Sequence, residues 1–306
     1  SLTPRIKETA TLLWKIYLGL TGAQVILLML TNGNISFFDA LTLSFSTIST
    51  GGFSTHNDSI AAYHSIHTEW VVILFMILGS LNFSLYFHCM KRKIYRIYEP
   101  EFFIYLLTLF AGAVILTATI WNTYSWPESW RYAVFQAVSS QSSTGFTTAN
   151  FSLWPFSSQY FLTILLFIGG MSGSTSGGIK MARHLISYKA IVSKLESLFR
   201  PETVRYLKIG QKELSSNTIQ TVLVFLAVMM FTVVLGTFLL ILDGLNFQKA
   251  FQIIASMTNN AGLLPTEWCA EMSYWSKIVS IFWMLLGRLE FFALLVVFFP
   301  SFWKNR

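Results

Sequence analysis

Apolar runs of two lengths alternate along the chain, in an order that recurs about every hundred residues. A helix needs about 20 apolar residues to span a bilayer, and three runs have this length: 10–30, 102–121 and 218–242. Three shorter runs have the length of re-entrant helices: 35–48, 129–140 and 247–257. A further long run follows each short one: 69–90, a run from 158 onward, and 274–299. This order predicts an all-α membrane protein made of helix–pore loop–helix units, with boundaries at 1–98, 99–212 and 213–306.

Glycines interrupt the last run of the middle unit. Five of the ten residues from 169 to 178 are Gly, and each costs about 1 kcal/mol relative to Ala inside a helix. An amphipathic, Lys-bearing segment follows at 179–198, and Pro201 discourages its continuation. We therefore expect a broken helix here.

Each short run ends in a loop rich in Gly, Ser and Thr, at 49–55, 142–148 and 258–262. Polar backbone at membrane depth is tolerated only where protein or a watery cavity surrounds it. Three such loops around one axis could bind a dehydrated cation with backbone carbonyls, and Gly accepts the left-handed torsions that turn successive carbonyls inward. The alternative is three ordinary connecting turns. The candidate filter residues are Thr50, Gly51, Gly52, Thr144, Gly145, Phe146, Ala261 and Gly262, with K⁺ ligands at Thr50, Gly51, Thr144, Gly145, Asn260 and Gly262.

The Gly-rich segment can be read as a gate below the filter or as a packing kink that neighbouring helices satisfy. The candidate gating residues are Gly169, Gly170, Gly173, Ser174, Thr175, Ser176, Gly177 and Gly178. Arg288 lies about halfway along the last apolar run, where a charge costs about 3 kcal/mol on insertion scales. We expect Arg288 to face the ion path near the Gly-rich segment, as a barrier to cations or as a structural partner of loop carbonyls. Glu290 is on the opposite side of that helix and is not its obvious partner.

Composition supports a membrane protein and excludes several other classes. The 306 residues are 54% hydrophobic and 11% charged, against about 25% charged in soluble domains. The net charge of +7 is concentrated between the units and at the tails, at Arg5, Lys7, Lys91, Arg92, Lys93, Arg96, the segment 180–212, Lys304 and Arg306. The motif loops hold Asp58, Glu69, Glu128, Glu267 and Glu271. The positive-inside rule then places the basic segments in the cytoplasm and the motif loops outside. Since this distribution accounts for the positive charge, no nucleic-acid partner is expected.

Other chemistry is not indicated. His56, His64 and His67 lack the spacing of a zinc site, and two cysteines are too few for a disulfide framework. The apolar segments contain no nucleophile–base set or carboxylate pair, so an enzyme is not expected. Residues 173–180 lack the contiguous Gly-Lys-Ser/Thr of a phosphate-binding loop.

Several stretches together resemble the TrkH-type potassium-translocating subunits of the Trk/Ktr/HKT superfamily. These are residues 2–10 (LTPRIKETA), 46–56 (STISTGGFSTH), 143–148 (STGFTT), 173–180 (GSTSGGIK) and 284–290 (MLLGRLE). The resemblance implies four units with pseudo-fourfold symmetry around a K⁺ filter, one filter glycine per unit at Gly51, Gly145 and Gly262, a gating loop at 173–178, and a pore-facing Arg288. Only three units are present, so the family's first unit is expected to be missing from this piece. The last filter, at 259–265, also departs from the family pattern.

The resemblance further implies a multi-pass protein of the bacterial inner membrane that takes up K⁺, pairs as a homodimer and binds a cytosolic nucleotide-binding regulatory subunit. K⁺ is then the transported ion, no covalent cofactor is expected, and nucleotide acts only through the partner. Two alternatives remain from the residues. One is a Na⁺-coupled K⁺ symporter, and the other is a non-conducting membrane scaffold for the nucleotide-binding regulator.

Overall fold

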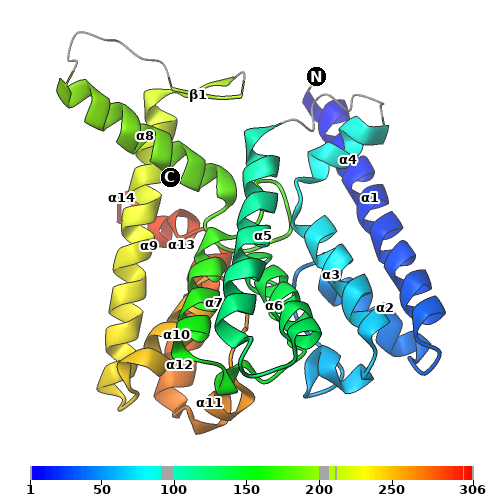
Figure 1. The fold of residues 1–306 in the computed structure, drawn as a ribbon. Helices are drawn as coiled ribbons and strands as arrows, with labels where there is room; N and C mark the ends of the chain where they lie inside the picture. Colours follow the sequence, from blue (N-terminus) through cyan, green and yellow to red (C-terminus); the bar gives the residue numbers. More distant parts are fainter. Residues whose placement is uncertain (1, 91–98, 200–206, 211, 299, 305–306) are drawn as a thin grey trace.

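A computed structural model describes residues 2–90, 99–199, 207–210, 212–298 and 300–304 (Figure 1). The chain is mostly helical, as the apolar runs predict. The basic cluster Lys91, Arg92, Lys93 and Arg96, the unit boundary at 98, Pro201 and Arg306 lie outside the described residues.

The first part of the chain contains α1 (Leu2–Thr31), the short α2 (Phe37–Ile48), α3 (Ile66–Ser80) and α4 (Phe83–Met90). Ser36 caps α2 by accepting a hydrogen bond from the backbone N–H of Asp39. The prediction of one helix over 69–90 is wrong, because α3 and α4 meet at an angle of 93°. Leu81 is extended between them, and the Phe83 N–H donates to the carbonyl of Gly173, a distant segment (3.1 Å). A tertiary contact therefore makes this bend.

The middle part contains α5 (Pro100–Ile120), α6 (Trp126–Gln141), α7 (Phe156–Ile168) and α8 (Met181–Phe199). Ser125 and Glu128 form a capping box at the start of α6. The predicted break of the Gly-rich segment is confirmed, because α7 ends at Gly169, whose φ is +71°. Two short 3₁₀ turns lie in the outer loops, at Ser59–Tyr63 and Phe151–Leu153.

The last part begins with a two-stranded antiparallel hairpin, β1 (Lys208–Ile209) and β2 (Lys212–Glu213). Six helices follow: α9 (Ser216–Leu242), α10 (Phe247–Thr258), α11 (Thr266–Glu271), α12 (Tyr274–Arg288), α13 (Phe292–Val297) and α14 (Pro300–Lys304). The prediction of one helix over 274–299 is wrong. Glu290 and Phe291 have φ of +54° and +56°, and the Phe291 N–H donates to the Leu286 carbonyl (3.0 Å), which closes α12. Arg288 is therefore the last residue of a helix and not the middle of one.

Among the residues that the structure describes, three helices are long and apolar enough to cross a membrane, within α1, α5 and α9, and a fourth crossing results if α3 and α4 count as one bent span. These helices expose large apolar side chains, such as Leu30, Phe110 and Phe231. Exposed apolar side chains on helices of membrane-spanning length are typical of surfaces that face lipid or another membrane protein. The chain is thus a multi-pass membrane protein.

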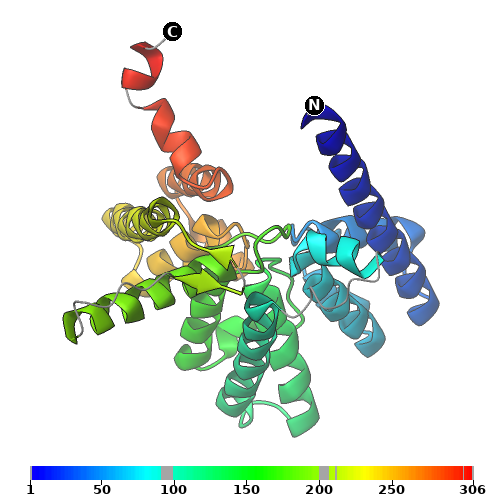
Figure 2. The ribbon, with the colours of Figure 1, turned by 90° about the horizontal axis from the view of Figure 1, so that it is seen from above.

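Seen from above, the helices lie in chain order around a common centre (Figure 2). α1 lies on one side of this arrangement and α13 and α14 lie on the other, with α5, α6 and α7 between them. Buried apolar clusters join neighbouring helices, for example Leu43 of α2 with Met76 of α3, and Ile253 of α10 with Trp283 of α12. The short helices α2, α6 and α10 are thereby held toward the centre.

An ion pair joins α3 to the first turns of α6. The Arg131 guanidinium donates to both carboxylate oxygens of Glu69, at 2.9 and 3.0 Å, and the two side chains are only 16% and 8% exposed. Removing one partner of a buried pair leaves an unpaired charge, so we expect Glu69→Ala to destabilise the protein by about 3 kcal/mol. Thermal unfolding in detergent measures this.

The Lys249–Glu271 pair has a Glu271 side chain that is 59% exposed, and it provides the control. We expect Glu271→Ala to cost less than about 1 kcal/mol. Equal shifts of the melting temperature in the two variants would contradict the prediction.

Candidate functional site

The three loops that follow α2, α6 and α10 share one backbone conformation. The first residue with left-handed torsions is Thr50, Ser143 or Asn260, with φ of +51°, +56° and +53°. Two residues later the conformation recurs at Gly52, Gly145 and Gly262, with φ of +71°, +86° and +65°. Between them, the N–H of Gly51, Thr144 or Ala261 donates to a carbonyl five residues earlier, at 2.7, 2.9 and 3.0 Å. The loops differ in sequence and agree in geometry.

This agreement changes which glycine of the first loop corresponds to the others. The motif comparison assigned Gly51 to the same role as Gly145 and Gly262. By backbone torsion and hydrogen bonding the matching residue is Gly52, and Gly51 matches Thr144 and Ala261. Ser143, which the sequence analysis did not select, matches Thr50 and Asn260. The pattern of positive torsions, every second residue, identifies it.

The loops approach one another backbone to backbone. A Cβ atom added to Gly52 would lie 1.9 Å from the Thr144 carbonyl oxygen, and one added to Gly145 would lie 1.8 Å from that of Ala261. No side chain fits at either position, so the left-handed torsion and the close contact both require Gly. Within the described part of the chain, nothing lies within 4 Å of a Cβ at Gly262. The first loop thus contacts the second, and the second contacts the third, backbone to backbone.

Phe146 has a different environment from the other candidate filter residues. Its side chain is fully buried, and the Ser139 hydroxyl donates to its carbonyl oxygen (2.7 Å). Phe53, at the matching position of the first loop, is 81% exposed.

Farther along the first loop, the Thr55 hydroxyl donates a hydrogen bond to the Asp39 carboxylate of α2 (2.6 Å). Hydrogen bonds from Thr55 and Ser36 hold the pKa of Asp39 below its usual range.

The Gly-rich segment between α7 and α8 lies against the carboxyl ends of the short helices. The Thr175 hydroxyl is within hydrogen-bonding distance of the Ile48 carbonyl at the end of α2 (2.8 Å) and of the Gly79 carbonyl (3.0 Å). A Cβ on Gly177 would lie 2.2 Å from the Asn259 carbonyl oxygen, at the end of α10. The segment also receives support from α5, because the Ser172 N–H donates to the Glu101 carboxylate (2.7 Å). From here on we call residues 169–180 the gating loop, and the three loops after α2, α6 and α10 the filter loops, after the roles that the sequence analysis predicts for them.

A pocket of about 290 Å³ lies between the gating loop and the filter loops. Its walls include Ser49 and Asn260 of the filter loops, residues 174–178 of the gating loop, and Arg288. Arg288 thus lies beside the Gly-rich segment, where the sequence analysis expected it. Among the residues that the structure describes, its guanidinium forms no hydrogen bond or ion pair.

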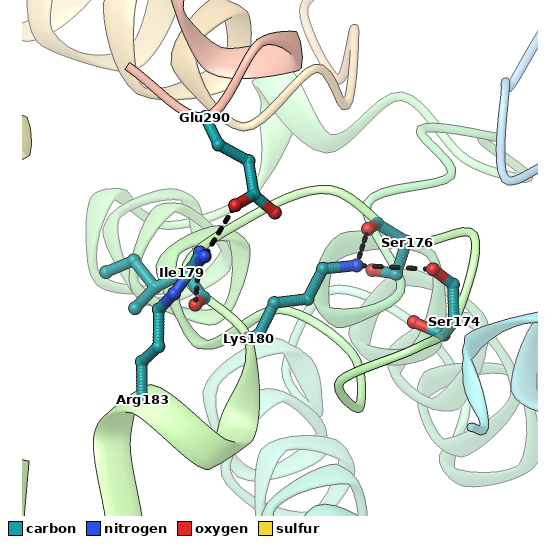
Figure 3. A network of polar contacts seen from close by, with 6 residues as sticks. All are labelled: Ser174, Ser176, Ile179, Lys180, Arg183 and Glu290. Atoms are coloured by element: carbon teal, nitrogen blue, oxygen red, sulfur yellow. Dashed lines mark hydrogen bonds and ion pairs between the residues drawn. The ribbon is translucent and has the colours of Figure 1, made fainter. Parts of the chain in front are cut away.

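Lys180 is the cation that contacts loop carbonyls, and the sequence analysis did not select it. Its ammonium group donates to the carbonyls of Ser174 (3.4 Å) and Ser176 (Figure 3). The Glu290 carboxylate accepts a hydrogen bond from Arg183 (2.7 Å) and not from Arg288. The structure therefore brings two basic side chains, Lys180 and Arg288, and the acidic side chain of Glu290 to one pocket.

Metal ligation is not a feature of the described residues, which contain no group of three His, Cys, Asp or Glu side chains able to hold a metal ion. Cys89 and Cys269 are both free and exposed. The pocket between the loops is lined instead by Ser, Thr, Gly and Asn residues together with basic and acidic side chains.

Comparison with known proteins agrees with this geometry. The model of the TrkH family, described as cation transport proteins, matches residues 1–305. The potassium uptake protein TrkH of Halomonas elongata is 34% identical over 99% of this chain and 64% of its own length. TrkH of Escherichia coli is 33% identical, again over 99% of this chain and 64% of its length. The crystal structure of the potassium transporter TrkH from Vibrio parahaemolyticus superposes with a TM-score of 0.89 at 33% identity, over 98% of this chain and 66% of that chain.

The chain therefore spans slightly less than two thirds of the length of these relatives. The match agrees with the prediction of a transporter and not an enzyme. With a family model matched from end to end and relatives one-third identical throughout, this chain belongs to the TrkH family of cation transport proteins.

Proposed function

We propose that this chain forms part of a K⁺ uptake pathway across the bacterial inner membrane, with the carbonyls of its three filter loops replacing the ion's water. The observation that carries this proposal is the backbone contact between successive loops, at Gly52 with Thr144 and at Gly145 with Ala261. Neutral carbonyl oxygens converging on one axis bind a dehydrated monovalent cation without burying a charge. The names of the relatives, potassium uptake proteins, support the choice of ion.

The filter in this proposal has four sides, of which the chain supplies three. The units are 1–98, 99–212 and 213–306, each with one short helix whose carboxyl end points at the loop. The negative end of a helix dipole favours a cation there. The proposed K⁺ ligands are carbonyls of Thr50, Gly51, Thr144, Gly145, Asn260 and Gly262, to which the shared geometry adds Gly52, Ser143 and Ala261. The open side at Gly262 is where a fourth unit fits.

The gate in this proposal is the gating loop together with Arg288. The loop lies on the carbonyls that end α2 and α10, so an ion leaving the filter meets it next. Arg288 lines the same pocket, and its positive charge raises the energy of a K⁺ ion that enters the pocket. Pairing as a homodimer and binding a cytosolic nucleotide-binding regulatory subunit rest on the family resemblance.

Uptake of Rb⁺ by liposomes that hold the protein at its full natural length tests the function. We expect Rb⁺ to accumulate when the liposomes contain K⁺ and the bath contains little, and to do so without Na⁺. Uptake that requires Na⁺ would instead support the symporter, and no uptake above that of empty liposomes would support the non-conducting scaffold.

A further inference from the structure

An ion pair connects the segment that follows the gating loop to the segment that follows Arg288. The Arg183 guanidinium, in the first turn of α8, donates to the Glu290 carboxylate at 2.7 Å (Figure 3). The side chains are 21% and 60% exposed. These two residues are more than a hundred positions apart in sequence. The pair is therefore a tertiary contact between two segments that are not neighbours along the chain.

Two contacts other than the one with Glu290 hold the Arg183 side chain in place. Its guanidinium lies over the ring of Phe225 in α9, at 4.1 Å from the ring centre, and it donates to the Ile179 carbonyl (3.4 Å). Phe225 also packs edge-on against Phe291, the residue after Glu290, with ring centres 5.5 Å apart. A basic group fixed in this way loses little side-chain freedom when it binds a carboxylate.

Glu290 occupies a backbone position that needs outside support. Glu290 and Phe291 are both in left-handed torsions, which L residues rarely adopt and which persist where surrounding contacts hold them. Arg288 lies two residues before Glu290, at the end of α12. The direction in which α12 ends, and with it the place of the Arg288 side chain, therefore depends on contacts made by Glu290 and Phe291.

The other end of the connection is the gating loop itself. Lys180 is three residues before Arg183, has a φ of +74°, and holds the loop carbonyls of Ser174 and Ser176 with its ammonium group. The Met181 N–H donates to the Gly170 carbonyl (2.9 Å) and closes the loop. A displacement of Arg183 would therefore reach the loop through a single turn of chain.

We infer that the Arg183–Glu290 ion pair positions the gate, by keeping both the gating loop and Arg288 at the pocket that they line. Both are positioning residues in this inference; Glu290 also lines the pocket, whereas Arg183 does not. The pair favours the closed arrangement, because its two ends move apart if either the loop or the end of α12 leaves the pocket. The link to ion flow rests on the proposed function, whereas the link between the pair and the loop does not.

Hydrogen exchange of the gating-loop amides and of the Met181 amide, which closes the loop, tests the inference in the full-length protein. We expect Glu290→Gln to raise exchange about two- to five-fold, the range for a partly exposed ion pair. The same substitution should add nothing in an Arg183→Gln background, because the partner is already absent. The matched control is Glu271→Gln, which breaks the Lys249–Glu271 pair of similar distance (2.8 Å) and exposure (29% and 59%) away from the loop.

Unchanged loop exchange in Glu290→Gln would overturn the inference, as would an equal effect in the Arg183→Gln background or in Glu271→Gln. Rb⁺ flux is measured on the same samples, and we expect it to rise in Glu290→Gln by a similar factor. If the parent protein carries no Rb⁺, the proposed function fails, and the exchange data still decide whether the pair positions the loop.

Discussion

A Gly145→Ser variant is expected to lose K⁺ over Na⁺ discrimination by at least about tenfold, which corresponds to about 1.4 kcal/mol between the two ions. Its Cβ would have to occupy a point 1.8 Å from the Ala261 carbonyl oxygen, so one loop must move. Moving a filter carbonyl by an ångström changes its distance to a dehydrated ion, and the compensation for lost water becomes less exact. Relative permeability from Rb⁺ and Na⁺ fluxes in liposomes measures the change.

The control for this variant is Gly244→Ser, in the turn between α9 and α10. Gly244 has a φ of +92°, close to the +86° of Gly145, and a Cβ there meets nothing within 4 Å in the described part of the chain. The control therefore has the torsional strain of the Gly145 variant without the collision. Equal loss of discrimination in both variants would show that backbone strain alone, and not loop-to-loop contact, is responsible.

An Arg288→Ala variant is expected to pass K⁺ on the order of tenfold faster at the same driving force. A unit charge about 6 Å from a cation at an effective dielectric constant of about 20 contributes about 3 kcal/mol, and solvent in the pocket reduces this. The guanidinium lines the pocket next to the gating loop, and the Glu290 carboxylate that shares this pocket is paired with Arg183. Initial rates of Rb⁺ uptake measure the effect.

Arg288→Lys separates charge from shape in this prediction. The lysine retains the positive charge and loses the planar guanidinium, so its uptake rate should stay close to that of the parent protein. If Lys and Ala raise the rate equally, the side chain acts by packing and the barrier is not electrostatic. A fall in rate for Arg288→Ala, at normal expression, would contradict the barrier altogether.

Much of the architecture could be predicted because it depends on neighbouring residues. The short helices α2 and α10 lie within two residues of the apolar runs 35–48 and 247–257, since caps and apolar length are local signals. The break at Gly169 was predictable for the same reason, because glycines lower helix stability wherever they stand. The bends at Leu81 and Glu290 were not, because neither site has Gly or Pro at the bend itself.

The filter loops show the limit most clearly. Their composition predicted a carbonyl site, and yet the motif alone matched Gly51 with Gly145, whereas the torsions match Gly52. Two adjacent glycines look alike in a sequence, and the structure distinguishes them by the left-handed torsion of Gly52 and by the Thr144 carbonyl beside it. Lys180 was overlooked because a lysine next to a Gly-rich run gives no sign of which carbonyls it will reach.

The amino-acid sequence by itself determined the membrane class, the alternation of long and short helices, and the polar loops at which they meet. All of these follow from the order of apolar, small and charged residues over a few turns of chain. The tertiary structure alone decided which glycine faces which carbonyl, where α3 and α12 bend, and which acid holds Arg183. These depend on carbonyls and charges supplied by segments far apart in the chain, whose positions no local pattern specifies.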